Sequence, residues 1–145
     1  MRVDRLKAET SARLAVIHVT ASLQSAALSL SRPGIGLAVV CQETGCVVGV
    51  LSKADLVRRF AISGLAEAPV AELMSRSVVS CCPGDDVHDV WQMMTARNLE
   101  NVPVLDANSA PLGILNIRDA MKMLFEEEEF LERSLVNYIS GVGYQ

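Results

Sequence analysis

The chain contains the stretch Val47-Val48-Gly49-Val50-Leu51-Ser52-Lys53-Ala54-Asp55, which predicts a short apolar strand running directly into a helix. A second stretch of the same form lies 64 positions further on, Pro111-Leu112-Gly113-Ile114-Leu115-Asn116-Ile117-Arg118-Asp119. Each stretch has a glycine in its strand and an aspartate three residues after the residue that would cap the helix. The two strand-to-helix turns are therefore expected to be equivalent parts of a larger repeat.

The repeat extends well beyond these turns. Without a gap, Leu23 aligns with Val87 and Val40 aligns with Val104, and the apolar pattern between them stays in phase. Each half predicts the order strand, helix, strand, strand, helix, so an internal repeat is the main organising signal of the chain. Because a unit of this size rarely buries its sheet alone, we expect the two halves to pack together.

Branched residues, turn residues and helical spacing place the elements. The expected strands are residues 14–19, 36–41, 47–51, 78–82, 102–105 and 112–115. Thr20 is expected to cap the helix after the first strand, and a long final helix is expected from about Asn116 to Ile139. The expected parts of the chain are an N-terminal arm or helix (1–13), a first repeat (14–64), a second repeat (65–125) and a C-terminal extension of the last helix (126–145).

Composition narrows the class of protein. The 145 residues are 50% hydrophobic and 21% charged, which is typical of one globular domain. A net charge of −4 argues against a general affinity for nucleic acid polymers or anionic membranes. No apolar run approaches the ~20 residues of a membrane helix, and Met1 to Thr10 lacks the apolar core of a secretory signal.

The cysteines are Cys41, Cys46, Cys81 and Cys82, and none belongs to a Cys-x-x-Cys pair. This pattern argues against a zinc site and favours reduced thiols in a cytoplasmic protein. Cys41 and Cys46 flank an expected turn, so a disulfide between them is the less favoured alternative.

The two turns have a structural interpretation. Ser52 can cap its helix by accepting from the amide near Asp55, and Asp55 can reach back to the amide of Ser52. Asn116 and Asp119 can do the same, and each cap would stabilise its helix by ~1 kcal/mol.

The same residues have a functional interpretation, which stays open beside the first. A helix N-terminus can hold phosphate, to which a serine hydroxyl adds a donor. The carboxylates of Asp55 and Asp119 can accept from the two hydroxyls of a ribose. Lys53 and Arg118 lie close enough in sequence to help bind the phosphate.

The doubled unit resembles a tandem pair of cystathionine-β-synthase (CBS) domains, a Bateman module. The resemblance rests on Ile35–Val40, Gly49–Asp55, Leu73–Ser75, Asn101–Asp106 and Gly113–Asp119. It implies an α/β fold of two β-α-β-β-α repeats packed sheet to sheet with pseudo-two-fold symmetry. The C-terminal sequence resembles that of small stand-alone bacterial CBS proteins, which implies a disc-like homodimer and an adenosine nucleotide in the cleft between the repeats.

An adenine would need an apolar slot beside exposed backbone, which the family commonly provides at strand edges. The candidates are Ile17, His18, Gly36, Leu37, Ala38, Val102 and Pro103. Gly36 would allow close approach of the backbone, although a glycine at a helix-to-strand turn explains it equally well.

The two halves depart differently from the family pattern, which favours serine or threonine three residues before the aspartate. The first half keeps this residue as Ser52, whereas the second half has Asn116. Glu100 also stands where relatives often carry a basic residue, and an acid there would repel phosphate. These departures favour one good site and weaken the second.

The last helix is longer than one repeat needs. Leu124, Leu131, Leu135 and Tyr138 recur on it at helical spacing, which predicts a partner surface, here a second copy of the chain.

The expected function is a regulatory sensor. It requires no cofactor, binds AMP first and ADP, ATP or a nicotinamide dinucleotide next, and acts on an unknown effector protein in trans. The alternative is a scaffold that dimerises and docks to an enzyme or transporter without binding a ligand. An enzyme is the least favoured class, because the sequence shows no nucleophile–base constellation and no metal-ligand spacing.

Overall fold

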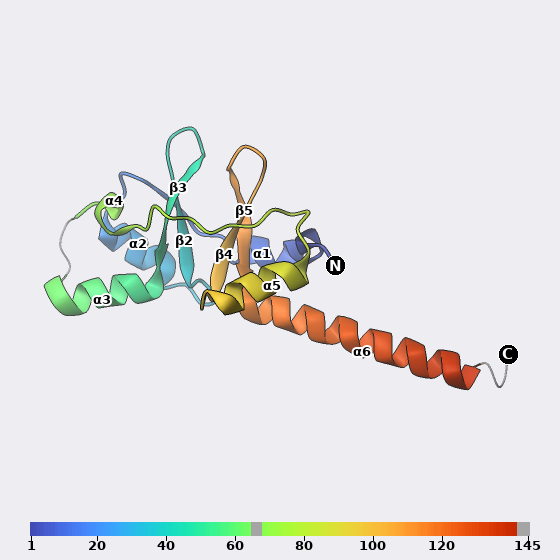
Figure 1. Ribbon diagram of the computed structural model, residues 1–145. Coiled ribbons are helices and arrows are strands. Elements are labelled where there is room, and N and C mark those ends of the chain that lie inside the picture. Colours follow the sequence, from blue (N-terminus) through green and yellow to red (C-terminus); the bar gives the residue numbers. More distant parts are fainter. Residues whose placement is uncertain (65–67, 142–145) are drawn as a thin grey trace.

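The computed structural model describes residues 1–64 and 68–141, with side chains up to residue 137 (Figure 1). The elements in chain order are the 3-10 helix η1 (Val3–Leu6), α1 (Lys7–Ala12), β1 (Val16–His18), α2 (Leu23–Leu30), β2 (Leu37–Cys41), β3 (Val47–Ser52), α3 (Lys53–Ser63), α4 (Val70–Leu73), α5 (Val87–Ala96), β4 (Asn101–Leu105), β5 (Pro111–Asn116) and α6 (Ile117–Gly141). The expected boundary between the repeats touches residues 65–67, and the expected extension includes 142–145; both segments lie outside the described residues.

The backbone confirms the 64-residue repeat. The β2–β3 and β4–β5 hairpins lie side by side in Figure 1, and each is antiparallel. The register shifts between Val40 and Cys41 in the first hairpin and between Val104 and Leu105 in the second. A bulge at the same place in both hairpins gives them the same bend.

Among the described residues, four of the five with positive φ form two equivalent pairs, and Gly64 has no counterpart. Gly34 (φ 82°) corresponds to Asn98 (φ 55°), and Gly45 (φ 87°) corresponds to Ser109 (φ 61°). Glycine adopts this backbone freely, and asparagine tolerates it better than most residues. The turns of the two halves therefore match even where the residue types do not.

The sheets differ from the expectation in one respect. The first has the order β1-β2-β3, but the second contains only β4 and β5, so the strand expected over 78–82 is wrong. A single parallel bridge between Cys81 and Val104 remains in its place. The strand stops there because the amide of Cys82 donates to the Asp85 side chain at 2.8 Å, and Pro83, which follows, has no amide hydrogen to continue a ladder.

The two halves pack sheet to sheet, as expected. Leu37 and Val39 of β2 pack with Ile114 of β5, and these three side chains are 0–8% exposed. All five residues of β2 are buried, which explains its unbroken apolar sequence. Each half adds a core of its own between its sheet and its helices.

The N-terminal residues form a helical segment that belongs to the second half. Val3 and Leu6 are buried in the second core. Gly113 lets α1 approach β5, because a Cβ atom there would lie 2.7 Å from the carbonyl group of Thr10. At the equivalent Gly49 of the first half, a Cβ atom would lie 2.6 Å from the sulfur of Met74. The N-terminal segment thus packs on the second half, and the residues around Met74, near the start of the second repeat in sequence, pack on the first half.

Helix α2 begins later than expected. Ser22 rather than Thr20 caps it, with its hydroxyl accepting from the Ser25 amide at 3.1 Å. The Thr20 hydroxyl instead lies 2.7 Å from Nδ1 of His18.

The long final helix is confirmed. Figure 1 shows α6 extending well beyond the rest of the molecule. Its exposed apolar side chains include Phe125, Phe130, Leu131, Leu135 and Val136, each 59–67% exposed. Of the expected stripe, Leu131 and Leu135 are exposed, whereas Leu124 is half-buried and packs against the second core. The side chain of Tyr138 lies outside the described residues.

Within the described part of the chain, no helix combines the length and apolar character needed to cross a membrane. All four cysteines are free thiols. Burial raises the pKa of the Cys81 thiol to about 12, so this group stays protonated and unreactive at neutral pH.

Candidate ligand cleft

A cleft of about 1020 Å³ lies where the two strand-to-helix turns meet. Its volume suits a small organic ligand. The lining residues are Arg13, Gly34, Ile35, Gly36, Leu37, Ser52, Lys53, Ala54, Val57, Arg58, Asn98, Leu99, Glu100, Asn101, Asn116, Ile117 and Arg118. The cleft therefore draws on both halves of the repeat.

The first turn has the expected cap. The Ser52 hydroxyl accepts from the Asp55 amide at 3.0 Å, and the Lys53 amide donates to the carbonyl of Gly36 at 2.9 Å. Instead of reaching back to the Ser52 amide, the Asp55 carboxylate accepts from Nη1 of Arg58 at 2.9 Å. These two side chains are 40% and 66% exposed, so the pair is weak and its carboxylate remains accessible.

The second turn is closed by contacts of its own. The Asn116 side chain accepts from the Arg118 amide at 2.9 Å and donates to Oδ1 of Asn101 at 2.9 Å. The Asp119 carboxylate is held by Arg13, with Nε–Oδ2 at 2.6 Å and Nη2–Oδ1 at 3.2 Å. The expected partnership of Asn116 with Asp119 is therefore replaced by two separate interactions.

Six of the residues expected at the site line the cleft together. The carboxylates of Asp55 and Asp119 are not among the lining, and Asp119 lines a separate pocket between the N-terminal segment and α6. The six are Gly36, Leu37, Ser52, Lys53, Asn116 and Arg118. The other expected residues lie away from it: Ile17, Ala38, Val102 and Pro103 are buried in the sheets, and His18 bonds Thr20. A base held at these strand edges would have to use backbone groups, and this part of the expectation stays a prediction.

Gly36 has a structural reason to be glycine. A Cβ atom there would lie 3.0 Å from Nδ2 of Asn101, which belongs to the opposite half. Gly36 thus allows the two halves to approach each other closely, and both Gly36 and Asn101 line the cleft.

Sequence reasoning missed Arg13 as a residue of the cleft. Its partner Asp119 lies 106 positions away, and no local pattern connects the two. The only signal in the sequence was its place among several basic residues near the N-terminus.

The side chains that line the cleft carry more positive than negative charge. Four basic side chains line it, against one acid, Glu100. Arg13 and Arg58 are paired with carboxylates, whereas Lys53 and Arg118 have no ion pair within the described residues. Glu100 has no ion pair among the described residues either, so two cations and one acid leave an excess of positive charge. This excess favours an anion as the ligand.

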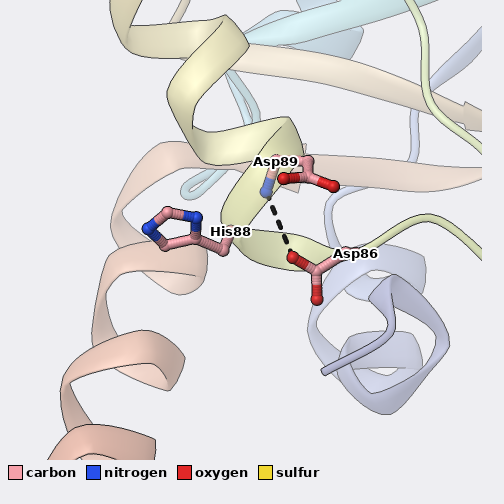
Figure 2. Close-up of side chains that lie close together, drawn as sticks. All are labelled: Asp86, His88 and Asp89. Carbon is pink, nitrogen blue, oxygen red and sulfur yellow. Dashed lines mark hydrogen bonds between the residues drawn. The ribbon is translucent and has the colours of Figure 1, made fainter.

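A second group of polar side chains lies at the start of α5, where Asp86, His88 and Asp89 gather (Figure 2). Asp86 is the N-cap of this helix and accepts from the Asp89 amide at 3.4 Å. Its other oxygen accepts from the Met1 ammonium group at 2.8 Å, and this bond lowers the pKa of Asp86. Capping and ion pairing account for this group, so we do not assign it as a metal site.

Two equivalent α/β halves that face one another across one cleft define a tandem-repeat α/β module. The chain belongs to the CBS domain family, whose model matches residues 9–62 and 70–126.

Solved structures share this arrangement. The CBS domain protein PAE2072 from Pyrobaculum aerophilum, complexed with AMP, is 25% identical, with a TM-score of 0.72 over 82% of this chain and 89% of that one. The CBS-domain containing protein ATU1752 from Agrobacterium tumefaciens is 27% identical, with a TM-score of 0.73 over 85% and 98% of the two chains. The CBS domain pair of protein MJ0100, in complex with 5′-methylthioadenosine and S-adenosyl-L-methionine, is 25% identical, with a TM-score of 0.72 over 86% and 99%.

Among curated proteins, the arabinose 5-phosphate isomerase GutQ of Salmonella typhi is 31% identical over 103 residues, which is 71% of this chain and 32% of that protein. The chain thus spans about a third of the length of such relatives. Because the match covers only this part, the isomerase reaction does not transfer to this chain with it.

Proposed function

We propose that this chain is a regulatory module that binds an adenine nucleotide, with AMP the first candidate, in the cleft between its two halves. The observation that carries the proposal is a pair of cations, Lys53 and Arg118, at the two facing strand-to-helix turns of one cleft. Neither forms an ion pair with another described residue. AMP bound to the similar protein PAE2072 supports the same class of ligand.

Charge favours a nucleotide over a neutral nucleoside. Lys53 and Arg118 receive the phosphate, and the Ser52 hydroxyl adds a donor at the N-terminus of α3. The ribose hydroxyls go to Asp55, whose only described side-chain partner is the exposed Arg58. The base lies along Gly36 and Leu37 and the neighbouring strand edges.

The module acts by binding rather than by turnover. A ligand between the halves favours the packing that fits it, and so shifts their relative arrangement. The interface that would respond includes the Asn101 contact at Gly36 and the cluster of Leu37, Val39 and Ile114. A partner protein in the cytoplasm would read this shift in trans.

Thermal unfolding of the full chain with AMP tests the proposal. AMP at 100 times its dissociation constant is expected to stabilise the fold by ~2.7 kcal/mol. Adenosine and inorganic phosphate, each tested alone at the same concentration, should shift the melting temperature much less. The absence of a shift with AMP, ADP, ATP and NAD would reject the sensor and favour the scaffold, in which the turns act only as helix caps.

We further propose that the chain forms a homodimer through α6. The helix extends past its own domain with five large apolar side chains exposed, which a second copy would cover. This surface is also the feature that favours the scaffold as the second candidate function.

Deleting residues 126–145 is expected to convert the dimer to a monomer, measured as mass in solution by light scattering. Leu131→Glu combined with Leu135→Glu should do the same without shortening the chain, because two buried charges would oppose association. Glu132→Gln, on the same helix, is the control and should leave the mass unchanged. A truncated chain that remains dimeric would rule out this role of α6.

A further inference from the structure

Arg13 joins three parts of the molecule at the edge of the cleft. Its Nε and Nη2 atoms donate to the two oxygens of Asp119 at 2.6 and 3.2 Å, and its Nη1 atom donates to the carbonyl of Gly34 at 2.8 Å. Asp119 lies in the first turn of α6 in the second half, whereas Gly34 belongs to the first half. One guanidinium therefore holds both halves and the N-terminal segment together.

The acids of the two equivalent turns are held very differently. Asp55 pairs with a neighbour on its own helix, and that pair is 40% and 66% exposed. Asp119 makes a two-pronged pair with Arg13, and these side chains are 18% and 27% exposed. A bidentate arginine–carboxylate pair is both stronger and more specific in direction than a single exposed contact. Asp55 can exchange Arg58 for a ribose at a low cost in free energy. If Asp119 bound a ribose, the partly buried Arg13 would lose its carboxylate partner, which costs more.

The capping residues show the same contrast. The Ser52 oxygen accepts from the Asp55 amide, and its own hydroxyl hydrogen remains available to a ligand. Both ends of the Asn116 amide are engaged, by Arg118 and by Asn101. The second turn thus offers neither an available acid nor the hydroxyl donor of the first.

We propose that Arg13 closes the second sugar subsite, so that each chain binds a single nucleotide, with its sugar at the first-half turn. This inference rests on the proposed function and adds the number and place of the ligands. Arg13 donates to both oxygens of Asp119, which would otherwise accept from the two ribose hydroxyls.

Isothermal titration of AMP into the full-length wild-type chain tests the inference, with the fitted number of sites as readout. One site per chain is expected. Asp119→Asn should keep that one site, with an affinity within about threefold of the wild type, because the ribose does not use this acid. Two sites per chain, or a loss of about tenfold or more in Asp119→Asn, would overturn the inference and leave the proposed function in place. A wild-type chain that binds no nucleotide would remove the proposed function and this inference together.

The ion pair is tested separately, without ligand. Arg13→Gln and Asp119→Asn should each lower the melting temperature, and the double variant should melt no lower than the less stable single variant, because both changes break the same bond. Asp55→Asn is the matched control, because it breaks the exposed pair of the first turn, and it should change the melting temperature less. Fully additive losses for Arg13→Gln and Asp119→Asn would show that the two side chains do not hold one another, and would also overturn the inference.

Discussion

Replacing Asp55 with alanine is expected to lower the affinity for AMP by about a hundredfold, or ~3 kcal/mol, because a carboxylate that accepts from two ribose hydroxyls contributes about this much. The fold should be little affected, since the bond that the variant removes is an exposed pair with Arg58 in which both side chains are at least 40% exposed. Titration calorimetry gives the affinity, and thermal unfolding without ligand gives the stability.

Asp89→Ala is the matched control for this variant. Like Asp55, Asp89 is an acid in the first turn of a helix, and its backbone amide donates to the capping side chain, here Asp86. Asp89 lies on α5 and is not among the residues that line the cleft. Both variants lose the same favourable interaction with a helix N-terminus, so their difference isolates the ribose contact. An Asp55→Ala protein that binds AMP as tightly as Asp89→Ala would show that this carboxylate does not hold the sugar.

Replacing Gly113 with alanine is expected to destabilise the fold by ~3 kcal/mol, the upper part of the usual range for an overpacked site. The new Cβ atom would lie 2.7 Å from the carbonyl carbon and oxygen of Thr10, and these are backbone atoms that cannot rotate away. Helix α1 would have to lift from β5 and draw Val3 and Leu6 out of the second core. Urea unfolding, read as the midpoint at unchanged slope, measures the loss.

Gly84→Ala is the control for this second variant. Its Cβ atom would meet only the end of the Arg2 side chain, at 3.5 Å, which is an ordinary contact. The expected change in unfolding free energy is within ~0.5 kcal/mol. Equal stabilities for the two variants would mean that the N-terminal segment is not packed against β5 in solution.

Much of the fold could be predicted from the sequence because it depends on local patterns that occur twice. The strand-to-helix turns at 47–55 and 111–119 were placed by a glycine, a capping residue and an acid. The two hairpins also repeat their bulges, and the positive φ angles of Gly34 and Gly45 recur at Asn98 and Ser109. The strand expected over 78–82 failed for an equally local reason. The pairing ends after the bridge between Cys81 and Val104, because the Cys82 amide donates to the Asp85 side chain and Pro83 has no amide hydrogen.

The site was harder to predict because its decisive contacts are long-range. The capping role of Ser52 follows from residues three positions apart, and it was confirmed. The pairing of Arg13 with Asp119 spans 106 positions and depends on how the N-terminal segment packs on the second half. The difference between Ser52 and Asn116 indicated that the two turns are unequal. Only the structure shows that Arg13 binds the carboxylate of Asp119 in the second turn.

A crystal structure of the full chain grown with saturating AMP would show whether the cleft between the two halves holds an adenine nucleotide. Density for one nucleotide is expected in this cleft, with its phosphate beside Lys53 and Arg118 and its ribose hydroxyls on Asp55, while Arg13 remains on Asp119. An empty cleft at saturating AMP, or a nucleotide bound elsewhere on the chain, would rule out this cleft as the nucleotide site.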